Sequence, residues 1–192
     1  MADRRIARSK VALRDALLTL MSEKSFSAIT ITEIVERANY NRGTFYTHYE
    51  NKEGLLDEVI SELIDELIES FRAPYGDLDV FRVDELTANS VKIFEHIHDR
   101  APVYTTLFHS DVLPVIKEKM FGAIKKLSSE ELEQETESIN RELMMVYSIH
   151  ALMGLVFHWI EGGFQYTPAY MQDQLIKMIN WRPTAAKTHV KK

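Results

Sequence analysis

Two helix-start signals follow each other closely, one at Thr30 and the other at Asn41. Thr30 and Glu33 form a capping box, in which the threonine hydroxyl accepts a hydrogen bond from a first-turn amide and the carboxylate bonds back to the threonine amide. The helix after Thr30 is therefore expected to cover residues 31–38. It is expected to end there because Asn39 is the non-glycine residue best suited to the left-handed conformation that closes a helix.

Asn41 can cap a second short helix, expected over residues 42–48, so that only Asn39 and Tyr40 lie between the two helices. Two short helices joined by so tight a turn must cross at a large angle, which is the geometry of a helix-turn-helix. The second helix is too short, and too rich in glycine, threonine and aromatic residues, to be stable alone. Other parts of the chain must therefore hold it in place.

The expected helix at 42–48 has two different faces. At about 100° per residue, Phe45 and Tyr49 share the inward face with Asn41. A glycine costs about 1 kcal/mol relative to alanine in a helix interior, so Gly43 indicates either a backbone approached closely by a partner or a strained turn. The outward side is small and polar, as a surface entering a major groove needs. It consists of Gly43, Thr44, Tyr46 and Thr47.

Lys52 is expected in the first turn of the next helix, which Asn51 caps. The helix dipole disfavours a cation there by about 0.3 to 1 kcal/mol. A bound phosphate would reverse that sign, because it takes hydrogen bonds from the free amides and an ion pair from the lysine. The alternative is a solvated lysine.

Helical periodicity continues along the rest of the chain, and no stretch has a convincing strand pattern. An all-α fold is therefore predicted. Besides the two short helices, the expected helices cover residues 4–22, 52–72, 83–99, a short piece after Pro102, 112–127, a stretch from 131 or 138 to 161, and 168–180.

Charge is unevenly distributed over the 192 residues. Residues 1–55 carry nine basic and seven acidic side chains, whereas the remainder has a net charge of −8. An acidic body repels a polyanion, so a nucleic acid would be approached through the basic end alone. The alternative is a random fluctuation, because the excess of two charges is small.

Several classes of protein are excluded or disfavoured. The chain has no cysteine, which rules out a disulfide framework, a thiolate metal site and a cysteine nucleophile. It also lacks the phosphate-binding, zinc-protease and serine-hydrolase motifs, so no enzyme activity, metal or cofactor is expected. The charged N-terminus does not resemble a signal peptide, and a cytoplasmic protein is expected.

One apolar run needs a separate explanation. Residues 143–160 carry no formal charge over 18 residues, which is near the lower limit for a membrane-spanning helix. His150 and His158 lie inside the run, and Glu142 and Glu161 flank it. We therefore expect a helix buried between two protein layers, with no membrane contact.

The segment from Thr30 to Leu56 resembles the DNA-binding signature of the TetR family of transcriptional regulators, most specifically in the string RGTFYTHYENKEGLL that begins at Arg42. The resemblance covers roughly the first 60 residues. It implies an N-terminal three-helix helix-turn-helix DNA-binding domain (1–51), a helical effector-binding and dimerisation domain (52–182) and a disordered tail (183–192). Asn39 replaces a glycine common in the family, and Tyr40 a small aliphatic residue.

The resemblance also assigns contacts to double-stranded DNA. Phosphate contacts are implied for Thr30, Tyr46, His48 and Lys52. Base-edge or groove contacts are implied for Thr32, Arg42, Gly43, Thr44 and Thr47.

The implied function is that of a bacterial homodimeric repressor, which binds a palindromic operator and is released by an unknown small-molecule effector. The alternative is an activator or co-regulator controlled by a protein partner. The C-terminal stretch with Trp159, Gly162-Gly163 and Thr167-Pro168 resembles a class of TetR-like regulators of Gram-positive bacteria, some of which answer to such a partner.

Dimerisation is also expected from geometry, because two successive major grooves lie about 34 to 36 Å apart and one helix reads only a few base pairs. Residues 143–160 and the last helix of each subunit can together form a four-helix interface between two subunits. The alternative is that these helices form only the core of a single chain. The residues of the last helix in this interface are Tyr170, Leu175, Ile176 and Ile179.

An apolar ligand pocket in the second domain is the least constrained expectation, since aromatic and methionine residues at helical spacing also make a plain core. The candidate lining residues are Phe94, Ile97, Tyr104, Phe108, Phe121, Met144, Tyr147, Met153 and Phe157.

Overall fold

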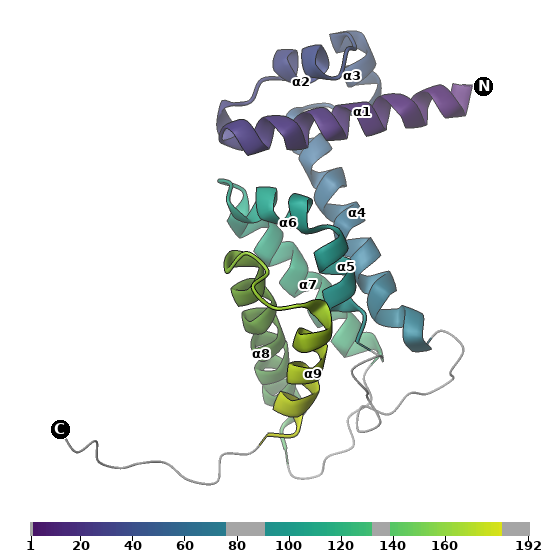
Figure 1. Ribbon diagram of the computed structural model, residues 1–192. Helices are drawn as coiled ribbons and strands as arrows, with labels where there is room; N and C mark the ends of the chain where they lie inside the picture. The colour runs from purple at the N-terminus through teal and green to yellow at the C-terminus, as the bar shows by residue number, and fades with distance from the viewer. Residues whose placement is uncertain (1, 76–90, 132–138, 182–192) are drawn as a thin grey trace, which may run out of the picture.

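The computed structural model describes residues 2–75, 91–131 and 139–181, and these ranges contain helices and no strand. The expected all-α fold is confirmed. The elements are α1 (Ala2–Glu23), η1 (Phe26–Ala28), α2 (Ile31–Arg37), α3 (Arg42–His48), α4 (Lys52–Arg72), η2 (Ala73–Tyr75), α5 (Ile93–Asp99), α6 (Ala101–Phe108), α7 (Leu113–Glu131), α8 (Arg141–Glu161) and α9 (Pro168–Ile179), where η marks a short 3₁₀ helix (Figure 1).

The molecule is elongated, with α1, α2 and α3 at one end and the α5–α9 bundle at the other (Figure 1). Helix α4 leaves the N-terminal end and runs along the bundle, where it contacts α5 and α7. Helix α6 contacts α1, so the two ends also touch away from α4. The second domain packs α8 against α6 and α7, and α9 against α5.

A continuous hydrophobic core runs through both ends of the molecule. Helix α4 belongs to both parts of it, because its buried residues recur every three or four positions along nearly its whole length. Burial of each large aliphatic side chain contributes about 1.5 to 3 kcal/mol, which makes α4 a firm connection between the ends. These residues are Leu55, Leu56, Val59, Ile60, Leu63, Ile64 and Leu67.

Most helix boundaries agree with the local signals. Asn140 caps α8 by accepting a bond from the amide of Leu143 at 3.1 Å, so the helix starts after the later of the two expected positions. Thr167 caps α9, and Pro168 occupies its first turn, as expected. Helix α5 begins at Ile93, and the earlier part of the helix expected over 83–99 falls largely outside the described residues, as does the tail at 183–192.

Helix α8 is only half covered by the rest of the chain. Among the described residues it is the one helix long and apolar enough to cross a membrane, and 33% of the window concerned is buried. One face reaches the core through Met153, Val156 and Ile160, whereas Leu143 and Tyr147 are 67% and 73% exposed. Within one chain the helix is therefore buried on one face only, and burial of the other face would need a second protein surface.

Candidate DNA interface

The helix-turn-helix is closed by the expected local contacts. Thr30 Oγ1 accepts a bond from the amide of Glu33, and a carboxylate oxygen of Glu33 accepts one from the amide of Thr30 at 2.9 Å. The bond from Lys24, together with those from Thr30, lowers the pKa of Glu33 to about 2. Asn39 has a φ of 57°, which is the left-handed conformation, and Asn41 Oδ1 accepts a bond from the amide of Thr44 at 2.8 Å.

Helix α3 is held by its inward face, which carries Phe45 at 0% exposure and ends at the buried Tyr49. The two rings lie 5.6 Å apart. The Tyr49 hydroxyl donates to Glu58 Oε1 of α4 at 2.6 Å. Burial and this neighbouring carboxylate raise the pKa of Tyr49, so the hydroxyl stays protonated and the bond persists. Asn41 itself is exposed and acts as the cap.

A second anchor joins the end of α3 to α1. His48 Nε2 lies 2.8 Å from the hydroxyl oxygen of Ser9, which is 3% exposed. The Ser9 hydroxyl also lies within hydrogen-bonding distance of two carbonyl oxygens of its own helix, that of Ile6 at 2.9 Å and that of Arg5 at 3.1 Å. Nε2 of His48 is occupied by this contact, so a phosphate can be bound only through Nδ1 and only when Nδ1 carries a proton.

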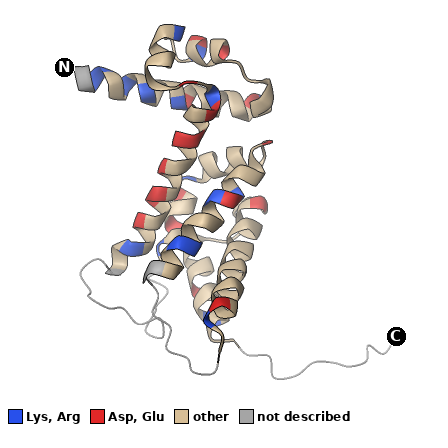
Figure 2. Cartoon of the chain, turned by 180° about the vertical axis from the view of Figure 1, so that it is seen from behind, with Lys and Arg blue, Asp and Glu red and all other residues tan. Residues whose placement is uncertain are grey.

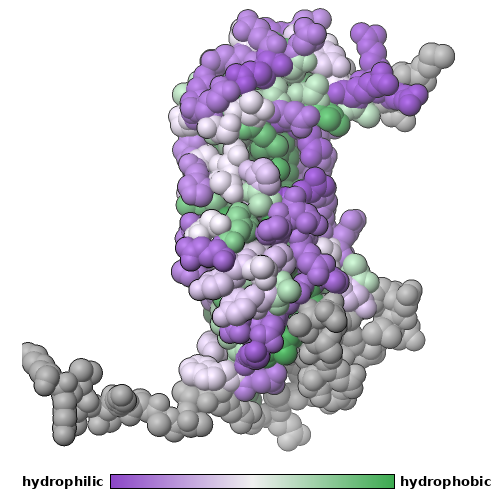
Figure 3. Space-filling model, viewed as in Figure 1, coloured by the Kyte–Doolittle hydropathy of each residue, from purple (hydrophilic) through white to green (hydrophobic). Residues whose placement is uncertain are grey.

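The outward face of α3 is exposed and polar, as expected. Gly43, Tyr46 and Thr47 are exposed, and Thr44 is half-buried. Figure 3 shows that hydrophilic residues cover most of this end of the molecule. Arg42 is also exposed, and its guanidinium contacts the hydroxyl of Thr32, so two candidate base-reading residues from α3 and α2 lie together.

The structure supplies an internal reason for Gly43. A Cβ atom at this position would lie 3.2 Å from Asn41 Oδ1, the atom that caps α3. Glycine leaves room for the cap side chain, so the residue does not by itself indicate a partner.

Lys52 is placed differently from the expectation. Its Nζ donates to the carbonyl oxygens of Phe26 at 2.9 Å, Ser27 at 3.0 Å and Ile29 at 2.8 Å. An ammonium group has three donors, and these contacts occupy all of them. The partly negative carbonyl oxygens thus stabilise a cation at a position where the helix dipole disfavours it.

Half of the other lysines and arginines of the N-terminal end are paired with carboxylates: Lys10 with Glu58, Arg14 with Glu62, Lys24 with Glu33, and Arg37 with Glu23. Within the part of the chain that the structure describes, Arg4, Arg5, Arg8 and Arg42 have no carboxylate partner. Figure 2 shows the basic residues along α1 and the acidic residues along α4. The sequence analysis did not select Arg4, Arg5 and Arg8 as candidate phosphate-binding residues. Their position could have indicated them, because the helix dipole disfavours cations in the first turns of a helix.

The candidate ligand residues do not line one pocket. Phe94, Ile97 and Tyr104 are fully buried in the core, whereas Tyr147 projects from the exposed face of α8. The core residues contact one another, as the rings of Phe108 and Phe157 do at 5.5 Å. Two surface grooves of the described residues, one between α4 and α5 and one between α1 and α2, include none of the candidates.

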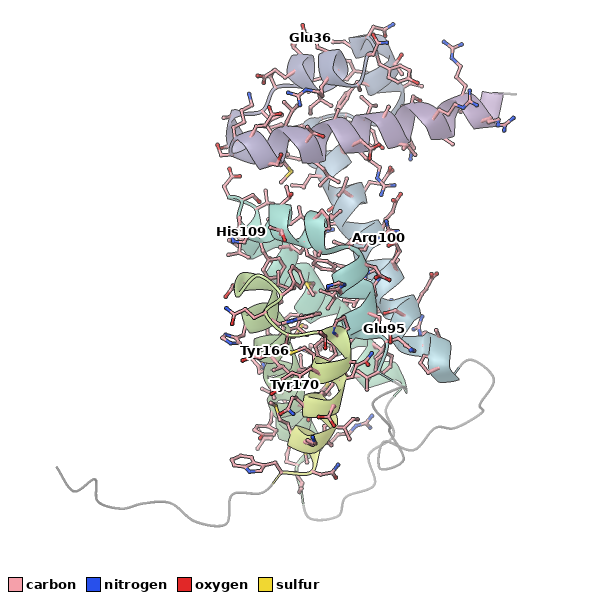
Figure 4. All side chains as sticks on the ribbon, viewed as in Figure 1. Glu36, Glu95, Arg100, His109, Tyr166 and Tyr170 are labelled. Atoms are coloured by element: carbon pink, nitrogen blue, oxygen red, sulfur yellow. The ribbon has the colours of Figure 1, made fainter. Side chains whose placement is uncertain are left out.

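One of these grooves, of about 600 Å³, lies between α4 and α5, and most of its lining residues are charged or polar. Arg100 pairs across it with Glu66 at 2.8 Å, and Glu95 and Arg100, both labelled in Figure 4, lie on its α5 side. In residues 2–75, 91–131 and 139–181 no group of three or more metal-ligating side chains is present.

Comparisons with known proteins cover the same two parts of the chain. The family model described as "Bacterial regulatory proteins, tetR family" matches residues 13–59. The model described as "Transcriptional regulator C-terminal region" matches residues 84–181.

Two curated relatives come from Bacillus subtilis and Rhodococcus jostii. The first, "Uncharacterized HTH-type transcriptional regulator YxbF", is 27% identical over 93% of this chain and 46% of its own length. The second, "HTH-type transcriptional repressor KstR2", is 24% identical over 63% of this chain and 58% of its own length. The chain thus spans about half the length of these relatives.

Two solved structures share the fold. A TetR transcriptional regulator from Streptococcus agalactiae has a TM-score of 0.60 and 23% identity, covering 93% of this chain and 97% of its own. A putative TetR-family regulator from Syntrophomonas wolfei has a TM-score of 0.64 and 14% identity, covering 94% and 95%.

Proposed function

The chain belongs to the TetR family of bacterial transcriptional regulators, and we propose that it is a homodimeric, cytoplasmic repressor that binds a palindromic operator. The observation that carries this proposal is the construction of α3. Its apolar side is fixed by Phe45 and Tyr49, and the opposite side is polar and mostly exposed. A helix presented in this way suits the major groove of duplex DNA.

The proposed contacts differ in two places from those that the family resemblance implies. Base edges are read by Arg42, Thr44 and Thr47 of α3 with Thr32 of α2, and the small Gly43 lets the backbone come close. Phosphates are bound by Thr30, Tyr46 and Nδ1 of His48, to which we add the unpaired arginines of α1. Lys52 is removed from the set.

We propose that α8 and α9 form the dimer interface. Their exposed side is apolar, with Val146 and Tyr147 of α8 and Ile179 of α9 between 48% and 73% exposed. Tyr166 and Tyr170, labelled in Figure 4, add a stacked pair of rings 4.9 Å apart. A twofold pair through this face brings two α3 helices to the spacing of successive major grooves. Leu175 and Ile176 are half-buried and contribute less.

Release of DNA is proposed to occur through α4. Glu58 of α4 pairs with Lys10 of α1, and Asp57 of α4 pairs with Lys119 of α7. Helix α4 is thus joined by ion pairs to both ends of the molecule. An effector that moves the second domain shifts α4 and changes the separation of the two α3 helices. One half-site is then bound less well, because its grooves no longer match the spacing of the helices.

The filled core of the second domain favours a second candidate for the effector. Large side chains such as Phe94, Tyr104 and Trp159 are fully buried where a small ligand would enter. A protein partner that binds the surface needs no internal cavity. The alternative function is therefore an activator or co-regulator that uses the same DNA-binding dimer and answers to a protein.

Selection of bound duplexes from a random pool by the purified full chain tests the proposal. We expect enrichment of an inverted repeat whose half-sites lie about one helical turn apart, or a multiple of it. No enrichment in dilute buffer, where phosphate contacts are strongest, would contradict it.

A further inference from the structure

The short helix η1 is held from one side by the second domain. Asp111 lies in the turn between α6 and α7, and its Oδ1 accepts a bond from the amide of Phe26 at 2.7 Å. Its Oδ2 accepts one from the amide of Ser27 at 3.0 Å. These two hydrogen bonds join the DNA-binding end to the second domain.

Lys52 holds the other side of the same turn. Its ammonium group donates hydrogen bonds to the carbonyl oxygens of Phe26, Ser27 and Ile29, and it lies 4.7 Å from the centre of the Phe26 ring. The amides of η1 thus face a negative charge and its carbonyls a positive charge, which matches the dipole of the turn. Phe26 and Ile29 are buried at 8% and 2% exposure, so the turn is also fixed by packing.

The turn leads directly into the DNA-reading helices. Ile29 is followed by Thr30, the cap of α2, and α2 contacts α3. A displacement of the α6–α7 turn is therefore passed to η1 through hydrogen bonds that accept little change in length, and then to α2 and α3. Burial disfavours the charged Asp111, but the bonds from Ser27 and Phe26 outweigh it and lower its pKa, so the carboxylate is ionised at neutral pH.

We propose that Asp111 is a positioning residue through which the second domain holds α2 and α3 at the separation that the operator requires. The inference rests on the proposed function. It assigns to the α6–α7 turn a direct connection to the DNA-binding end, in addition to α4.

The test uses Asp111→Asn, which keeps the shape of the side chain but replaces one acceptor oxygen by a donor, so that at most one of the two bonds survives. Asp99→Asn is the matched control, because it makes the same chemical change at an exposed position of the second domain, at the end of α5. Both proteins are compared with wild type on the selected inverted repeat and on versions with one base pair added to or removed from the centre.

We expect the preference of wild type for the best spacing to fall by about tenfold or more in Asp111→Asn and to stay unchanged in Asp99→Asn. Hydrogen exchange is expected to be about tenfold faster at the amides of Phe26 and Ser27, and faster also in α2 and α3. Unchanged spacing preference, or faster exchange confined to the two η1 amides, would overturn the inference, whatever happens to the melting temperature.

The two readouts separate this inference from the proposed function. Failure of wild type to bind any duplex would refute the function, and exchange in α2 and α3 would then decide whether Asp111 positions them. If Asp111→Asn does not fold, as judged by circular dichroism, Asp111→Glu replaces it. That variant keeps the charge and displaces the carboxylate by one methylene, and the same two results are decisive.

Discussion

The hydroxyl of Ser9 in α1 shares a hydrogen bond of 2.8 Å with Nε2 of His48, the last residue of α3. This bond fixes one end of the recognition helix to the scaffold and decides which ring nitrogen of the histidine is free. It also explains why a polar residue is buried in an otherwise apolar part of α1, where Leu13 and Leu17 are fully covered.

Ser9→Ala is expected to lower the free energy of unfolding by about 1 to 2 kcal/mol, because it leaves Nε2 of His48 without its hydrogen-bond partner. Ser22→Ala is the control, since that serine is exposed on the same helix and bonds only to the carbonyl of Thr19. It should change stability by less than about 0.5 kcal/mol. Urea unfolding measures both, and equal effects would contradict the assigned role of Ser9.

Lys52→Met should lower the free energy of unfolding by about 1 to 3 kcal/mol, because it removes the charged donor from three carbonyl oxygens. The slope of log affinity for DNA against log salt concentration should not change. If Lys52 bound a phosphate, the substitution would instead reduce the magnitude of that slope by about 0.9 for each half-site. Such a reduction would show that Lys52 binds a phosphate and would contradict a role confined to contacts within the protein.

The double variant Arg5→Ala/Arg8→Ala is expected to reduce the magnitude of the salt slope by about 0.9 for each phosphate that the variant no longer binds, on specific and random duplexes alike. Lys125→Ala/Lys126→Ala removes the same charge from exposed positions of α7 and should leave the slope unchanged. If both double variants change the slope equally, the arginines act only through net charge and make no local contact.

Tyr147→Glu is expected to convert the dimer into a monomer, because a charge would be buried in the apolar interface proposed on α8. Val115→Glu serves as the control, since Val115 is an exposed apolar residue of α7, outside that face. Analytical ultracentrifugation measures the mass of each protein. A dimeric Tyr147→Glu protein of normal stability would place the interface elsewhere.

The DNA-binding end could be predicted because its signals are local. The capping box of Thr30 and Glu33, the left-handed Asn39 and the cap at Asn41 each involve residues within a few positions of one another. Such contacts depend little on the rest of the fold. The start of α3 and the division between its two faces follow from them directly.

Contacts between distant residues were not predictable in the same way. Asp111 bonds to an amide 85 positions away, and the carbonyls around Lys52 come from residues 23 to 26 positions earlier. The unfavourable position of Lys52 in the first helical turn indicated a negatively charged or dipolar partner. Backbone carbonyls and a phosphate satisfy that requirement equally, and only the fold distinguishes them.

Helix α8 shows a different limit. It is apolar on nearly every side, so periodicity does not indicate which side faces the core. The sequence pattern therefore placed Tyr147 with Phe157 in one candidate pocket, whereas the structure puts Phe157 in the core and leaves Tyr147 73% exposed. The orientation of such a helix is decided by its neighbours α6 and α7.

The most direct test of base reading by α3 is the ratio of affinities for the selected inverted repeat and a scrambled duplex, measured at one salt concentration with wild type and Arg42→Ala. We expect a ratio of at least about 10³ for wild type, reduced about tenfold or more by the substitution, with affinity for scrambled DNA changed far less. A wild-type ratio near one in dilute buffer, or an equal decrease on both duplexes in Arg42→Ala, would contradict base reading by this helix.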